Sequence, residues 1–164
     1  MLDIPLSVGG SVISMAVTEP SPIILRQLIQ HATRHLTLKQ APSGTFIIGG
    51  GWPGRYIRAT NEKTAGLEDV AGNLWRAVRV VPALQRLHLL RTWAGVIPKT
   101  SDAEPIFGEC AGAKSFLVMV FPSGSAGLTV GPVVGRLMAE LLTKGQTSIS
   151  MEIYDPARHA KRSL

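Results

Sequence analysis

The apolar run Ser115-Phe116-Leu117-Val118-Met119-Val120-Phe121 leads directly into Pro122-Ser123-Gly124-Ser125-Ala126-Gly127-Leu128-Thr129-Val130-Gly131. A continuous apolar run of this length is typical of a strand buried on both faces, as in a parallel sheet. The glycine-bearing segment after it predicts a turn, with Pro132 near the start of a helix and Gly145 just past its end. The apolar stripe of that helix comprises Val133, Val134, Leu137, Met138, Leu141 and Leu142. A strand, a turn and a helix N-terminus together are suited to binding an anion or a polar ligand.

Upstream of this unit the sequence predicts short strands, tight turns and two helices. A hairpin is indicated by His35 to Gln40 and Thr45 to Ile48, which flank Ala41-Pro42-Ser43-Gly44. The three glycines at Gly49 to Gly51 indicate close backbone approach or positive φ, and a loop is expected from there to Asn61. The other expected elements are strands at Ser11 to Val17, Leu87 to Ala94 and Ile106 to Gly108, a short helix over Ile23 to Ile29, and a longer helix from Leu67 to Val81.

Composition excludes several classes of protein. The chain is 45% hydrophobic and 17% charged with 17 glycines and 11 prolines, which favours a packed, sheet-containing protein. No apolar run approaches the length of a membrane span, and an acidic Asp3 stands where a signal peptide carries basic residues, so we expect a cytoplasmic protein without a membrane partner. The single Cys110 excludes an internal disulfide and is expected to be a buried, inert thiol.

The net charge of +6 raises the question of a nucleic-acid partner. The basic residues are scattered, and the one cluster, Arg158 to Arg162, is interpreted as a solvated terminus, so no nucleic-acid partner is predicted. Among the four histidines only His31 and His35 have a spacing that suits a metal, and they lack a third ligand nearby. No metal site is predicted.

Three ordered blocks resemble one known family. The first contains His35 to Gln40 and then Gly44 to Gly54; the second, Arg91 to Gly108, contains W-A-G followed by P-x-T-x-D-x-x-P-I-x-G; the third is Gly127 to Leu137. In order and spacing they resemble the D-amino acid oxidase-like FAD-dependent oxidoreductases, in the branch that includes the sarcosine oxidase beta subunit, glycine oxidase and hydroxyproline dehydrogenase. The blocks together cover nearly the whole chain.

The resemblance implies a mixed α+β fold in two parts. An antiparallel substrate-domain sheet is expected in residues 1–108, and residues 109–164 are expected to supply the returning strand, turn and helix of a Rossmann-like FAD domain. The strand and helix that carry the family's G-x-G-x-x-G, and with them the N-terminal FAD-binding half, are expected to be missing. Val8-Gly9-Gly10 precedes a strand rather than a helix and is no substitute. The chain is therefore interpreted as a truncated or split protein.

The resemblance also implies which residues contact the ligands. Gly127, Leu128, Thr129, Val130 and Gly131 match the family's final flavin-contacting turn and are expected to bind FAD, mostly through backbone N–H groups. Negative charge at the N1–C2=O2 edge of the reduced flavin suits a helix N-terminus. The site is only partial, because nothing in the chain matches the groups that hold the rest of FAD.

The expected substrate contacts are Thr37, Trp93, Ile97 and Ser125. Relatives often carry an arginine at the position of Ile97, where it pairs with a substrate carboxylate, and a histidine or arginine near Ser125. Of Thr37 and Lys39, one is expected to face the pocket. No side chain is predicted as a general acid or base, and Gly95 stands where some relatives attach flavin through cysteine.

Two hypotheses follow for function. In the first, the chain is the C-terminal segment of an FAD-dependent enzyme that oxidises the C–N bond of a small amino or imino acid such as sarcosine, glycine or hydroxyproline, and it is inactive alone. In the second, it is a non-catalytic relic or an assembly subunit that completes a partner chain carrying the FAD-binding half. Both hypotheses leave open which amino acid is the substrate.

Overall fold

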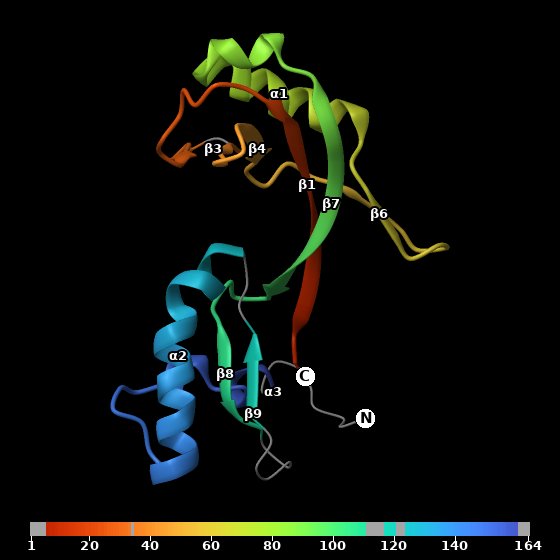
Figure 1. Cartoon of the computed structure of the whole chain (residues 1–164). Helices are drawn as coiled ribbons and strands as arrows, with labels where there is room; N and C mark the ends of the chain where they lie inside the picture. The colour runs from red at the N-terminus through yellow and green to blue at the C-terminus, as the bar shows by residue number, and fades with distance from the viewer. Residues whose placement is uncertain (1–5, 34, 111–116, 121–123, 161–164) are drawn as a thin grey trace. The chain divides into compact units, whose positions relative to one another are not determined.

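The computed structural model of the chain describes residues 6–33, 35–110, 117–120 and 124–160 and divides into two compact units (Figure 1). One unit is Val12–Val96, and the other comprises Met1–Ser11 and Ile97–Leu164. Residues 97–108 thus belong with the C-terminal segment, whereas the sequence placed the division after residue 108. The mixed α/β character and the antiparallel sheet agree with the expected fold class.

The order of elements confirms most of the expected helices and strands. The strands are β1 (Val8–Pro20), β2 (Ile29–Gln30), β3 (Thr37–Gln40), β4 (Thr45–Gly49), β5 (Arg55–Ile57), β6 (Glu62–Thr64), β7 (Leu89–Thr100), β8 (Ile106–Glu109) and β9 (Leu117–Val120). The helices are α1 (Leu67–Val80), α2 (Gly124–Lys144) and α3 (Ala157–Ala160), with 3-10 turns at Pro82–Arg86 (η1) and Glu152–Tyr154 (η2).

A five-stranded sheet forms the larger layer, in the order β2-β3-β4-β1-β7. The expected hairpin is confirmed: β3 and β4 pair antiparallel, with Leu38 opposite Ile48, and Gly44 in the turn has φ of 90°. Ala16 of β1 is also opposite Ile48, so the three side chains share one face. Helix α1 packs on that face, where Ala77 joins the buried cluster (Figure 1). The cluster contains Ala16, Leu36, Leu38, Phe46, Ile48, Ala77 and Leu84.

The predicted helix over Ile23–Ile29 is wrong: residues 21–28 are not helical. The side-chain amide of Gln40 supplies the hydrogen bonds that a helix would otherwise make. Its Oε1 accepts from the backbone N–H groups of Ile24 (2.9 Å) and Leu25 (3.0 Å), and its Nε2 donates to the carbonyls of Pro22 (2.9 Å) and Gly44 (3.0 Å). Because these backbone groups are already paired, the segment has no need of intrahelical bonds.

The segment Gly49-Gly50-Gly51-Trp52-Pro53-Gly54 has the letter spacing G-x-G-x-x-G, yet it is not a dinucleotide-binding turn. It follows β4, but β5 comes after it instead of a helix. Gly50 and Gly51 have φ of 120° and 84°, and a Cβ at Gly50 would lie 2.4 Å from the backbone of Leu36. The glycines therefore allow close packing, as expected. The loop expected as far as Asn61 is wrong in part, because β5 pairs with β6.

Helix α1 confirms the predicted helix but not its whole apolar face. Val70 and Ala77 are buried, whereas Leu67 is 85% exposed and Trp75 is 56% exposed. Trp52 fixes the helix from another side: its ring leaves no room for a Cβ at Gly72, and its Nε1 donates to the carbonyl of His35 (2.9 Å). Trp52 is therefore a packing residue.

The second unit contains a two-stranded sheet and α2. Strands β8 and β9 pair antiparallel, with Phe107 opposite Met119. Leu117–Val120 of the apolar run thus form a strand, although it pairs with β8 antiparallel and not parallel; the rest of the run lies outside the described residues. Figure 1 shows α2 alongside this pair of strands, and Val134 and Leu137 are its buried residues.

Gln40 provides a test of the irregular segment. We expect Gln40→Met to lower the free energy of unfolding by about 1–3 kcal/mol, because the carbonyls and N–H groups that it pairs lose their partners. Urea denaturation of the chain, followed by far-UV circular dichroism, measures the change. The matched control is Gln27→Met, at an exposed position in the same segment, which should change stability by less than about 0.5 kcal/mol. Equal effects of the two substitutions would contradict this role for Gln40.

Candidate functional site

The start of α2 is the candidate ligand site, and its geometry differs from the expected turn. The helix already begins at Gly124, so Gly127 to Gly131 are helical and Pro132 lies inside the helix. An α-helix leaves free N–H groups only in its first turn; later ones donate to the carbonyl four residues back. The N–H of Gly127 is the first that donates within a helix beginning at Gly124, so none of the five predicted flavin contacts offers a free amide. Contact of these five residues with flavin stays a prediction, and it would use their surfaces.

Among the described residues, nothing covers one face of α2. Leu128 is 88% exposed, and a Cβ built on Gly131 or Gly135 would meet no atom within 4 Å. Pro132 has no N–H, so the carbonyl of Leu128 receives no intrahelical bond from it. These features leave room for a flat group to approach the helix closely.

The expected substrate residues are distributed over both units. Thr37 on β3 and Trp93 on β7 belong to Val12–Val96, whereas Ile97 and Ser125 belong to the other unit. In the sheet, β4 and β1 separate β3 from β7, so Thr37 and Trp93 are about 14 Å apart across the strands. Ser125 lies in the first turn of α2, and its side chain is outside the described residues.

Thr37 lies on the face of the sheet opposite α1. It pairs with Gly49, where a Cβ would lie 2.2 Å from the Sδ of Met15. Thr37 and Lys39 are two residues apart and share this face of the sheet, and contact of either residue with a substrate stays a prediction. Trp93 is 37% exposed, and Arg91 stacks over its ring at 5.3 Å.

The block Thr100 to Gly108 is held by hydrogen bonds that explain its sequence. The Thr100 hydroxyl donates to the carbonyl of Glu104 (2.8 Å), and Ala103 adopts φ of 63°. Gly108 has φ of 147°, and a Cβ there would lie 3.1 Å from Pro156. Phe107 stacks on Tyr154, with ring centroids 4.6 Å apart. These contacts hold the block against the C-terminal segment.

Arg158 is the residue that sequence reasoning missed. Its Nε donates to Oδ2 of Asp102 (2.9 Å), and its Nη2 donates to the carbonyls of Pro105 (2.8 Å) and Glu104 (3.1 Å). The interpretation of this arginine as part of a solvated tail is therefore wrong. Its hydrogen bonds to Asp102 hold the pKa of that carboxyl well below its usual range. The residues around Arg158 give no indication in the sequence that it pairs with Asp102, which lies 56 residues earlier.

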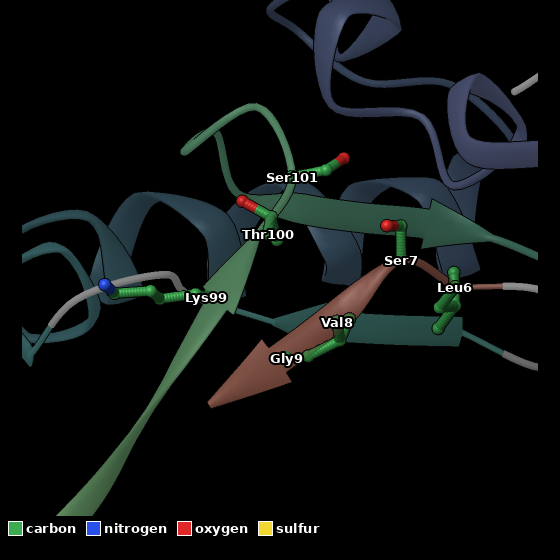
Figure 2. A pocket seen from close by; sticks show the side chains of 7 residues that line it. All are labelled: Leu6, Ser7, Val8, Gly9, Lys99, Thr100 and Ser101. Atoms are coloured by element: carbon green, nitrogen blue, oxygen red, sulfur yellow. The ribbon is translucent and has the colours of Figure 1, made fainter. Parts of the chain in front are cut away.

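Two further features of the described residues are Cys110 and a hollow at the surface. Cys110 is buried, as expected, and burial raises the pKa of its thiol. The hollow in Figure 2 lies between the chain near Ser7 and that near Lys99, but the polar ends of Lys99 and Ser101 point in opposite directions. Within the described ranges there is no group of three potential metal ligands, and no helix is long and apolar enough to span a membrane.

A family model described as FAD dependent oxidoreductase matches residues 1–141. The chain belongs to this family. The match covers most of the chain, including the five-stranded sheet, the Thr100 to Gly108 block and nearly all of α2. It confirms the family resemblance seen in the sequence.

Individual relatives of this FAD-dependent family agree with the assignment. The sarcosine oxidase subunit beta of Rhodobacter capsulatus is 26% identical over 136 residues, which are 83% of this chain and 32% of that protein. The glycine oxidase of Geobacillus kaustophilus is 25% identical over 140 residues, 85% of this chain and 36% of the relative. The chain thus spans about a third of the length of the curated relatives it matches.

Solved structures support the same fold. The L-proline dehydrogenase from P. horikoshii superposes with a TM-score of 0.81 and 29% identity, covering 99% of this chain and 43% of that one. The glycine oxidase structure from Geobacillus kaustophilus gives a TM-score of 0.73 at 21% identity, covering 95% and 40%. The second likeness concerns the fold alone.

The Asp102–Arg158 pair predicts a pH-dependent contribution to stability. The folded-state pKa of Asp102 is depressed, so the pair stabilises fully above the unfolded pKa of about 3.9, and this contribution is lost as the pH falls toward the folded pKa. At pH 7 we expect Asp102→Asn to lower the free energy of unfolding by about 1–3 kcal/mol. Urea denaturation at pH 7 and at pH 3 should show the difference shrinking at the lower pH. Glu152→Gln, at an exposed position, is the control and should have little effect; a pH-independent loss in Asp102→Asn would contradict the ion-pair explanation.

Proposed function

We propose that this chain forms the substrate-domain portion and the flavin-facing C-terminal helix of an enzyme that oxidises the C–N bond of a small amino or imino acid. The observation that carries the proposal is the family match over residues 1–141. The likeness to an L-proline dehydrogenase over 99% of the chain at 29% identity supports this class of substrate, as do relatives named sarcosine oxidase subunit beta and glycine oxidase.

The residues at the start of α2 fit the ring edge of a flavin. Bound FAD would accept a hydride from the carbon next to the substrate nitrogen. The positive end of the α2 dipole favours negative charge placed at its first turn, Gly124 to Gly127. The open space beside Gly131 lets a flat ring approach the helix, and exposed Leu128 offers an apolar contact. This chain would therefore orient the ring and stabilise its charge.

The substrate contacts that we propose are neutral. Thr37 offers a hydroxyl, Trp93 and Ile97 offer apolar surface, and Ser125 lies at the helix start. Ile97 cannot pair with a carboxylate, so the group that binds the substrate carboxylate in this protein must stand elsewhere. None of these four is a general acid or base at neutral pH. Deprotonation of the substrate amine before oxidation would then not depend on them.

We further propose that the pyrophosphate, ribose and adenine of FAD are held by polypeptide outside these 164 residues, and that the chain alone is inactive. Gly49 to Gly54 carry the only G-x-G-x-x-G spacing in the sequence, and they are used for packing against Leu36. Relatives named as subunits, the sarcosine oxidase subunit beta and the hydrogen cyanide synthase subunit HcnC, favour a second candidate function. In that function the chain completes a partner chain and performs no catalysis itself.

The absorbance spectrum of the purified chain with added FAD tests the need for a second polypeptide. We expect no bound yellow flavin and no bleaching by proline, glycine or sarcosine. Co-production with the N-terminal portion of the L-proline dehydrogenase relative is expected to restore flavin binding, and bleaching by one of these substrates would favour the enzymatic function over the purely structural one. A chain that alone binds FAD and is bleached by an amino acid would contradict the requirement for further polypeptide.

Gly131 tests the contact with flavin. In the co-produced complex, Gly131→Val should raise the dissociation constant of FAD at least tenfold, because the added side chain fills the space that the ring needs. The matched control is Gly135→Val, one helical turn further along, where a Cβ also meets open space. Fluorescence titration with FAD measures both variants. Equal affinities would remove Gly131 from the proposed site.

A further inference from the structure

The outer face of α1 carries an exposed stripe. Leu67, Ala71, Trp75 and Arg79 recur at four-residue spacing and therefore lie along one side of the helix. All four are exposed, Leu67 at 85% and Trp75 at 56%, whereas Val70 and Ala77 face the sheet. Large apolar side chains aligned on a solvent-facing helix surface are a feature of interaction sites. We call these four residues the α1 stripe.

The two ends of α1 carry opposite charges. Glu68 lies in the first turn of the helix and Arg79 in the last. The guanidinium of Arg79 stacks over the ring of Trp75, with its Cζ 4.9 Å from the ring centroid. Stacking restrains the long arginine side chain, so its planar group is ready to pair with a carboxylate at little further cost in entropy.

We propose that the α1 stripe binds the α1 stripe of a second copy of this chain, with the two helices antiparallel. An antiparallel register that sets Ala71 against the partner's Trp75 also sets Leu67 against the partner's Arg79. The indole then covers a small residue, which allows the helices to approach closely. Glu68 comes beside the partner's Arg79, and the two-fold axis repeats each contact.

Charge complementarity selects a second copy as the occupant. A helix with an acidic first turn and a basic last turn complements itself when reversed, whereas an acidic partner would be repelled by Glu68 and a basic one by Arg79. The 14-residue helix is about 21 Å long, so the contact is smaller than a standard stable interface and the dimer is expected to be weak and reversible. Trp75 should contribute most of the affinity, as buried tryptophans commonly do.

Sedimentation velocity of the 164-residue chain at increasing concentration tests the dimer. We expect a reversible monomer–dimer equilibrium, and Trp75→Glu should raise the dissociation constant at least tenfold. The matched control is Leu142→Glu, which places the same charge at a 66% exposed leucine of α2 and should leave the equilibrium unchanged. A monomer at every concentration would overturn the proposal, as would association that Leu142→Glu abolishes and Trp75→Glu does not.

Charge reversal tests the antiparallel register. Glu68→Arg and Arg79→Glu should each weaken self-association at least fivefold, because each brings like charges together. An equimolar mixture of these two variants should associate again, since each chain then meets the opposite charge at both ends, and the double variant should behave like the unaltered chain within about threefold. Circular dichroism confirms that the variants remain folded. Failure of the mixture and of the double variant to associate would overturn the register.

Discussion

Burial of one face of the β3–β4–β1 strands against α1 is the interaction on which the larger unit depends. Leu38, Phe46 and Ile48 alternate along the hairpin with residues that are half-buried or, at Lys39, exposed, and Ala77 closes the cluster from the helix. The small side chain of Ala77 lets the helix lie close to the sheet, and η1 adds Leu84 at one end. The opposite face of the same strands is left without a helix in this unit, and it presents Thr37 and Met15. Because Leu38 and Ile48 face α1, the residues next to them along the strands, such as Thr37, lie on the opposite face of the sheet.

Single polar side chains determine the irregular parts of the structure. Gln40 pairs with backbone groups of Pro22, Ile24 and Leu25 and thereby holds a segment of eight residues in a non-helical path. Arg158 holds the turn between β7 and β8 by donating hydrogen bonds to the carboxylate of Asp102 and to the carbonyls of Glu104 and Pro105. In both places one side chain with several donors or acceptors replaces a ladder of backbone hydrogen bonds. The sequence around Asp102 therefore has a role in folding.

Helix α2 links the fold to the proposed function. Its inner residues Val134 and Leu137 pack within the unit, which holds the helix in place, whereas Leu128, Gly131 and Gly135 remain uncovered. A helix that is anchored on one side and bare on the other can accept a flat ring or another polypeptide without rearrangement. The chain spans about a third of the length of the curated relatives it matches, and this exposed surface of α2 is where we propose that flavin binds. The α1 stripe is a second bare surface, on a helix with opposite charges at its ends.

Local patterns in the sequence determined the regular elements and the family. Periodic apolar residues specified α1 and the hairpin, glycines marked the places of positive φ, and the ordered blocks identified an FAD-dependent oxidoreductase. Only the tertiary structure decided the rest. Residues 21–28 avoid a helix because Gln40 lies beside them in space, and Leu67 and Trp75 are exposed because the sheet covers a narrower face of α1 than periodicity suggests. The helix begins at Gly124 and not after Gly131, so the predicted flavin contacts lie inside the helix and offer no free N–H group. The non-helical path of residues 21–28 and the exposure of Leu67 and Trp75 depend on contacts between residues far apart in the chain, and local pattern carries no information about such contacts.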